Sequence, residues 1–290
     1  FEELVKFMYE NLEGFGEDCA IDGKFLDTYA SKNNTNKCND NRAEHEATFS
    51  CKTYEMKDGS KKQEWHYGFR AHIICDAKYG LPIKSKVTPA NNSEQTELDN
   101  LLKEMQNNDK EQYKLEKMKN LIGDAGYDNG SRNKRIKEEY NVNPIIDIVH
   151  RWDKTEKYRE IENQPIAYTE EGEVFYIVDL NNYEKMKYLG YDKENNALRY
   201  TRYNTGKKIY RIPLETDYRI FTSVARDSKK FKKKYKMRTE IERLNGRIDR
   251  DYMFNDHFIR GQKKMELMLN LTFIAVSYTH LRAHETVLDL

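Results

Sequence analysis

Two aspartates each follow a short apolar segment that predicts a buried strand. Asp22 comes after Cys19-Ala20-Ile21, Asp124 comes after the segment 118–122 with one glycine between, and small residues follow both. A carboxylate at a strand end with small neighbours can point into a cleft and leave room for a substrate. Either aspartate taken alone also fits the start of an ordinary turn.

A glutamate on a predicted helix over 231–249 adds a third carboxylate. Tyr235, Arg238, Glu242 and Asp249 are spaced i, i+3, i+7 and i+14, which places them on one helix face. The alternative is a surface ion pair between Arg238 and Glu242, worth about 0.2–0.5 kcal/mol.

Asp22, Asp124 and Glu242 together suit a hard divalent cation such as Mg²⁺ or Mn²⁺. Two such ions about 3.5–4 Å apart can hold the attacking and leaving oxygens of a phosphoryl displacement. We expect Asp22 to bridge both ions and the other two acids to bind one each.

A basic run precedes the glutamate. Residues 226–264 hold 14 Lys and Arg against 6 Asp and Glu, although the whole chain has a net charge of +1. The run includes Lys232, Lys233 and Lys234 and is interleaved with aromatics, which suits a phosphate backbone. A solvated helix face is the alternative.

Composition sets limits on the class of protein. The chain has 290 residues, 38% hydrophobic, 34% charged and 12% aromatic, which allows one large domain or two small ones and argues against disorder. No apolar run is long enough to predict a membrane helix, and no leader is visible. Cys19, Cys38, Cys51 and Cys75 lack metal-site spacing, so we expect free thiols in a reducing cytosol.

Hydrophobic periodicity predicts a mixed α/β sheet. Expected strands cover 19–23, 64–76, 81–87, 118–122 and 142–148, and expected helices cover 1–16, 93–107, 129–140, 231–249 and 258–275. The polar segment 31–50 predicts a loop, and the Tyr-rich stretch 155–222 predicts several short antiparallel strands.

Three motifs in order resemble those of DDE insertion-sequence transposases with the Tyr-x-x-Arg-x-x-x-Glu signature, a branch of the RNase H-like superfamily. They are Ala20-Ile21-Asp22-Gly23-Lys24, residues 121–128 (LIGDAGYD) and residues 235–243 (YKMRTEIER). Flanking phrases at 65–72, 88–91 and 259–265 are similar as well, so the resemblance covers about residues 15–275.

The resemblance implies a fold and a set of boundaries. We expect an RNase H-like mixed sheet flanked by helices, with a β-rich insertion before the last catalytic helix. The expected divisions are a truncated N-terminal helical region (1–16), the core (17–154), the insertion (155–225), the C-terminal core helices (226–275) and an adapter-derived artefact (276–290). The last segment breaks the preceding helical pattern, and its His280 and His284 are therefore discounted as metal ligands.

The resemblance also implies the chemistry. Asp22, Asp124 and Glu242 would hold two Mg²⁺ or Mn²⁺ ions and catalyse cleavage at element ends and strand transfer into target DNA. The implied DNA contacts are Tyr235, Arg238, Lys232, Lys233, Lys234, Arg243 and Arg247. The expected partners are the element's terminal inverted repeats and target DNA, bound by a homodimer in a prokaryotic cytoplasm, associated with the nucleoid and not with a membrane.

Some residues depart from the pattern or compete with it. Some relatives carry a lysine where this chain has Asp249, so a DNA-contacting cation is lost there or is replaced by Arg247 or Arg250. Asp27 and Asp128 are near neighbours of the motif acids that we do not expect to bind metal.

Two other functions stay open, a nuclease that cuts without joining and a non-catalytic DNA-binding relic. Trp65, His66 and His72 are weaker site candidates, for which a buried strand aromatic or a satisfied core histidine is the favoured interpretation.

Overall fold

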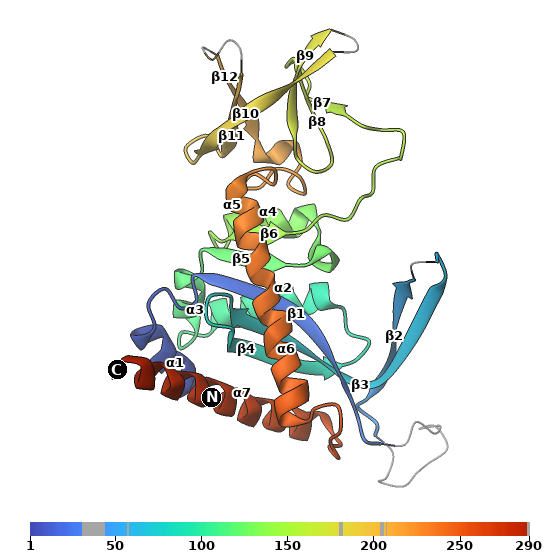
Figure 1. Cartoon of the computed structure of the whole chain (residues 1–290), viewed down its shortest axis with the longest axis vertical. Coiled ribbons are helices and arrows are strands. Elements are labelled where there is room, and N and C mark those ends of the chain that lie inside the picture. Colours follow the sequence, from blue (N-terminus) through green and yellow to red (C-terminus); the bar gives the residue numbers. More distant parts are fainter. Residues whose placement is uncertain (31–43, 57, 180–181, 204–205, 207, 289–290) are drawn as a thin grey trace. The chain divides into compact units, whose positions relative to one another are not determined.

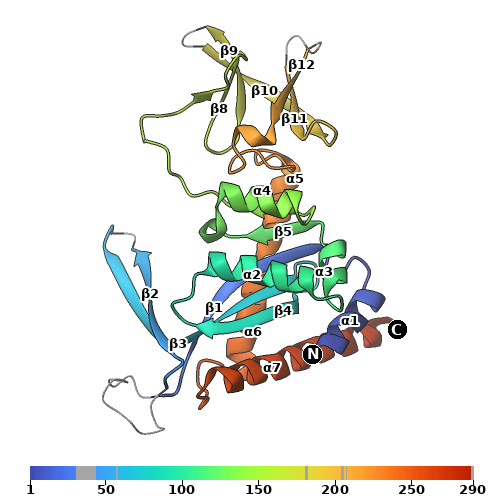
Figure 2. The ribbon, with the colours of Figure 1, turned by 180° about the vertical axis from the view of Figure 1, so that it is seen from behind.

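The chain divides into two compact units in the computed structural model, which describes residues 1–30, 44–56, 58–179, 182–203, 206 and 208–288. Unit 1 comprises Phe1–Gln112 and Thr239–Leu290, and unit 2 comprises Tyr113–Arg238. Both combine strands with helices (Figures 1 and 2).

Unit 1 is built around the long strand β3 (Lys61–Asp76). It pairs antiparallel with β1 (Asp18–Asp27), β2 (Thr48–Glu55) and β4 (Leu81–Pro89). β2 was not predicted, and its start at Thr48 lies within the segment 31–50 that was expected to be a loop. Alternating Phe49, Cys51 and Thr53 fit a strand, but the Asn-rich residues before them obscure the pattern.

Helices cover this sheet on both faces. α2 (Glu94–Asn107) and α6 (Thr239–Tyr252) lie on opposite sides, as the two views together show (Figures 1 and 2). Each buries an apolar stripe at helical spacing, consisting of Leu98, Leu101, Leu102 and Met105 in α2 and of Ile241, Leu244 and Ile248 in α6.

α1 (Glu2–Asn11) and α7 (Gln262–Leu288) complete unit 1. α7 packs against β4 and buries Met265, Leu269, Phe273 and Val276. The predicted loss of helical character after residue 275 is wrong, since α7 continues through this point as one helix.

Unit 2 begins with α3 (Gln112–Lys117) and two parallel strands, β5 (Asn120–Gly123) and β6 (Asn143–Ile146). Between them lie the 3₁₀ turn η1 (Ala125–Tyr127) and α4 (Gly130–Glu138). The helix begins where the Asn129 side chain accepts a hydrogen bond from Arg132 N, an N-cap.

A separate antiparallel sheet fills the stretch predicted to be β-rich. Its strand order is β12-β11-β10-β9-β8-β7. The strands are β7 (Arg159–Glu160), β8 (Ile166–Tyr168), β9 (Val174–Asp179), β10 (Asn182–Asp192), β11 (Ala197–Arg202) and β12 (Ile209–Pro213), with the turn η2 (Leu214–Thr216) after them. A core rich in Tyr, Ile and Leu lies beneath this sheet.

The predicted single helix over 231–249 is wrong. α5 (Lys229–Tyr235) is followed by a 3₁₀ turn, η3 (Lys236–Arg238), and α6 begins at Thr239. A 3₁₀ turn has three residues per turn instead of 3.6, so it breaks the i, i+3, i+7 phase. Tyr235 and Arg238 therefore do not share one regular helix face with Glu242.

Cys19, Cys51 and Cys75 are free thiols, and Cys38 lies outside the described residues. Burial raises the pKa of Cys19 and Cys75 well above the ordinary value. Within the described ranges, none of the helices combines the length and apolar character needed to cross a bilayer.

Candidate active site

Asp22 lies in the middle of β1 and not at its end, because the strand continues to Asp27. Its side chain is half-buried, and Asp22 Oδ1 accepts a 2.9 Å hydrogen bond from Gly23 N. A Cβ at Gly23 would come within 2.5 Å of the Glu94 side chain from α2. The small residue after Asp22 therefore makes room for the Glu94 side chain in this structure.

Helix α6 meets β1 through two polar pairs. Asn245 Nδ2 donates a 2.9 Å hydrogen bond to Asp22 Oδ2, and Lys24 Nζ lies 2.6 Å from Asp249 Oδ2. Asp22 and Lys24 share one face of the strand, and their partners are one helical turn apart. The two pairs fit because two strand residues span about 6.6 Å and four helical residues span about 6 Å.

Glu242 lies about one turn before Asn245 on the same helix, which places it about 4.5 Å closer to the N-terminal end of the helix. It is exposed and belongs to the first turn of α6, where the helix dipole favours a carboxylate. Unit 1 thus presents Asp22 and Glu242 on the side of the sheet that α6 covers.

Asp124 directly follows β5, as predicted for a strand-end carboxylate. Its Oδ1 accepts a 2.9 Å hydrogen bond from Gly126 N and caps the turn η1. A second carboxylate, Asp147, occupies the equivalent position after β6. The parallel register pairs Gly123 with Ile146, and Asp147 N donates to Gly123 O at 3.3 Å, so the two aspartates follow adjacent strand ends.

Tyr235 connects the end of α5 to this strand end. Its hydroxyl donates to Asp147 Oδ2 at 3.1 Å, and the Arg238 guanidinium lies 5.9 Å from its ring centre. Burial, followed by the charge and hydrogen bond of Asp147, raises the pKa of Tyr235 to about 12, and Asp124 adds to the effect. The phenol therefore stays protonated, and its single hydrogen is donated to Asp147.

The basic run forms the exposed surface of α5. Ser228 Oγ caps this helix through Phe231 N at 3.1 Å, and Phe231 is the buried residue among the lysines. Lys232 and Lys233 are exposed and Lys234 is half-buried. A pocket in unit 2 is lined in part by Lys232, Lys236, Arg226, Phe231, Tyr235 and Asp147.

The arginines of α6 point elsewhere. Arg243 is exposed and pairs with Glu240, and Arg247 Nη2 donates to Gly80 O at 3.3 Å. Arg250 is exposed and pairs with Asp251 at 2.6 Å. At 100° per residue, Arg243 lies roughly a third of a turn and Arg247 nearly half a turn from the face of Glu242 and Asn245.

Both competing aspartates are held by other side chains. Asp27 is exposed and lies 3.2 Å from His66 Nδ1. Asp128 is fully buried, and its Oδ2 accepts from Val149 N at 2.9 Å and from Arg219 Nε at 3.0 Å. These contacts give Asp128 a structural role in the interior of unit 2, whereas Asp27 makes one exposed pair.

The weaker candidates have mixed outcomes. His72 is a core residue with Nε2 2.9 Å from Thr88 Oγ1, and burial lowers its pKa to about 4. His66 stacks on Phe25 at 4.2 Å between ring centres. Trp65 is 59% exposed, so the expectation of a buried aromatic is wrong there. Among the described residues, this end of β3 pairs with the exposed strand β2 alone.

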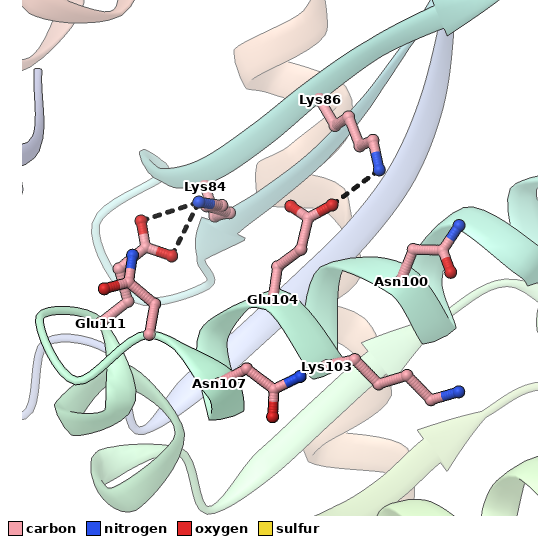
Figure 3. A pocket seen from close by; sticks show the side chains of 8 residues that line it. Lys84, Lys86, Asn100, Lys103, Glu104, Asn107 and Glu111 are labelled. Atoms are coloured by element: carbon pink, nitrogen blue, oxygen red, sulfur yellow. Dashed lines mark hydrogen bonds and ion pairs between the residues drawn. The ribbon is translucent and has the colours of Figure 1, made fainter.

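A polar pocket in unit 1 lies apart from these acids (Figure 3). It is lined by Lys84, Lys86, Asn100, Lys103, Glu104, Asn107, Asn108 and Glu111. Lys84 binds Glu111 at 2.7 Å and Lys86 binds Glu104 at 2.7 Å, so glutamates on and after α2 already neutralise both lysines of β4. We interpret the pocket as part of the polar contact between these elements.

A family model for the transposase DDE domain matches residues 13–278. The chain belongs to this family. The predicted fold class, an RNase H-like mixed sheet flanked by helices with a β-rich insertion, is confirmed by the match and the observed elements. No curated protein and no solved structure matches the chain.

Membership makes the chain a transposase-type enzyme that acts on DNA, in a family that generally uses divalent metal ions. Among the residues that the structure describes, no three His, Cys, Asp or Glu side chains are gathered as a ready ligand set. The donor chemistry nevertheless fits, since Asp22 and Glu242 offer carboxylate oxygens in unit 1 and Asp124 offers them in unit 2.

Sequence reasoning missed Asp147 and Asn245. Asp147 lies inside the predicted strand 142–148 and is followed by Ile148, so a criterion based on strand ends and small neighbours passes over it. Asn245 lies three residues after Glu242, a helical spacing that marks it as a neighbour on the same face.

Proposed function

We propose that this chain catalyses metal-dependent DNA cleavage at the ends of a mobile element and transfers the freed strand to target DNA. The proposal is supported by one observation in a chain of the DDE family. Asp22 on β1 accepts a hydrogen bond from Asn245 of α6, which lies one helical turn from Glu242. Asp124, directly after β5, supplies the third acid of the family pattern.

In this proposal Asp22, Asp124 and Glu242 hold two Mg²⁺ or Mn²⁺ ions. Bound there, the ions would activate the attacking oxygen and stabilise the leaving oxygen of the phosphodiester. The first reaction consumes water and yields a 3′-hydroxyl at the element end and a 5′-phosphate on the flanking DNA. In the second reaction, that hydroxyl attacks a phosphodiester of the target and displaces its 3′-oxygen. One phosphodiester bond therefore forms as another breaks.

The basic residues would bind the DNA backbone. Lys232, Lys233 and Lys234 on α5 are proposed to contact phosphates, with Arg238 beside them and with Arg243 and Arg247 on α6. Tyr235 can donate a hydrogen bond to a phosphate oxygen only after its hydrogen bond to Asp147 breaks, because a phenol has a single donor hydrogen. We also propose a homodimer that holds two element ends in the cytoplasm.

The test uses a labelled duplex that carries the element's terminal inverted repeat, with Mg²⁺, Mn²⁺ or EDTA. We expect nicking at the repeat end that requires the metal, followed by joining to a second, unlabelled duplex. Nicking without joining would indicate the simple nuclease. Binding without cleavage in either metal would indicate the DNA-binding relic and would refute the proposal.

A further inference from the structure

One side chain of α6 holds the carboxylate of Asp22 directly. Asn245 Nδ2 donates to Asp22 Oδ2 at 2.9 Å, and Gly23 N donates to Oδ1 at 2.9 Å. Each carboxylate oxygen is thus fixed by a hydrogen bond, and a carboxylate oxygen has two lone pairs, so one such bond does not exhaust it. The two bonds therefore help to set the plane of the carboxylate.

The holding group is neutral, which matters for a residue that binds cations. One turn further along α6, β1 is held by an ion pair, Lys24 with Asp249 at 2.6 Å. A lysine or arginine at position 245 would neutralise Asp22 and compete with a metal ion. An amide can orient Asp22 without itself neutralising the carboxylate.

This amide is not well placed for stability alone. Asn245 Oδ1 is buried and has no hydrogen-bond partner within the described part of the chain. A buried carbonyl without a partner destabilises the folded state, and a leucine of similar size would remove that cost. A buried unpaired group in a native structure calls for an explanation, and a role in orienting Asp22 supplies one for Asn245.

We propose that Asn245 is a positioning residue that orients the Asp22 carboxylate toward a divalent cation. The inference rests on the proposed function, because it takes Asp22 as a metal ligand. A purely structural amide would instead contribute to folding and leave metal affinity unaffected.

The test compares the wild-type chain with Asn245→Leu in two measurements that need no turnover. Mn²⁺ affinity is measured by electron paramagnetic resonance, and the melting temperature is measured without metal. We expect Asn245→Leu to bind Mn²⁺ about tenfold or more weakly, the usual effect of losing a group that orients a metal ligand, with an equal or higher melting temperature. Asn245→Ala also lacks the donor but adds no bulk. It therefore tests the same loss in case leucine packs poorly at this position.

Asn270→Leu on α7 is the matched control and should keep wild-type Mn²⁺ affinity. Unchanged Mn²⁺ affinity in both Asn245 variants, with Asp22→Asn losing Mn²⁺ binding, would overturn the inference and leave the proposed function standing. If Asp22→Asn binds Mn²⁺ and cleaves DNA as the wild type does, the site assignment and the inference both fail.

Discussion

Asp22 in unit 1 and Asp128 in unit 2 are both aspartates of the motif regions, but they differ in burial and in the charge of the groups that bind them. Asp22 is half-buried and accepts from a neutral amide and from the next backbone N–H. Asp128 is fully buried and accepts from Arg219, which also binds Glu170 at 3.0 Å.

The contrast shows how surroundings separate a structural carboxylate from one available to a ligand. Removing a buried charge from water is costly, so Asp128 persists because Arg219 compensates it. Asp22 is only half-buried, and neither the amide of Asn245 nor the backbone N–H of Gly23 carries a charge. Position in a motif does not distinguish the two, whereas burial and the charge of the partner do.

The largest expected effect is on catalysis. Asp22→Asn and Glu242→Gln should each lower strand cleavage about a thousandfold or more, because metal-ion stabilisation of the transition state is worth several kcal/mol. Melting temperature and DNA affinity should change little, since both side chains are at least partly exposed. Gel assays and melting curves measure this, with Asp27→Asn on the same strand as control. Wild-type cleavage by either variant would remove that residue from the site.

Asp128→Asn should have the reverse effect. Arg219 would lose one of its two carboxylate partners and keep Glu170, while a neutral amide would replace the buried charge, and we expect the free energy of unfolding to fall by about 3 kcal/mol. Urea denaturation measures the loss. Asp27→Asn, which removes an exposed partner of His66, should change stability by about 0.5 kcal/mol or less. A loss below about 1 kcal/mol for Asp128→Asn would contradict the structural role.

Lys232, Lys233 and Lys234 should matter for DNA affinity and not for folding. Replacing all three with alanine should reduce the slope of log affinity against log salt by about 0.9 for each phosphate that is no longer neutralised, or about 3 in total. Filter binding between about 50 and 200 mM salt measures the slope. The matched control replaces Lys187 in β10, Lys193 just after β10 and Lys208 just before β12 with alanine, and an equal slope change there would make the effect one of net charge.

Local sequence patterns predicted what depends on neighbouring residues. Asp124 was placed after its strand because an apolar run and small residues are local features. The extension of β1 to Asp27 was missed because it depends on pairing with β3, more than forty positions away in the sequence. The break at 236–238 contains neither Gly nor Pro, so no local breaker marks it.

The site residues follow the same division. Motif spacing identified Asp22 and Glu242, but Asn245 gains its role from a contact across 223 residues, and Asp147 gains its own from Tyr235 across 88. Hydrogen bonds between elements of this kind depend on the register of the packed elements. Helical or strand periodicity in a single sequence does not contain that information.

The smallest expected effect concerns Asp147, which resembles Asp22 in accepting from a neutral donor. Burial is the larger cause of the raised pKa of Tyr235, about 12, and the charge of Asp147 is the next. Asp147→Asn removes the charge that opposes phenolate formation, so the pKa should fall but stay above the ordinary tyrosine value because burial remains. The folded wild type holds this proton while the unfolded chain releases it near 10, so the associated stability is lost as pH rises from about 10 to 12. NMR of ring-labelled tyrosine, with Tyr235→Phe to assign the signal, measures the shift. An unchanged pKa in Asp147→Asn would mean that burial alone protonates Tyr235 and that Asp147 is free for another partner.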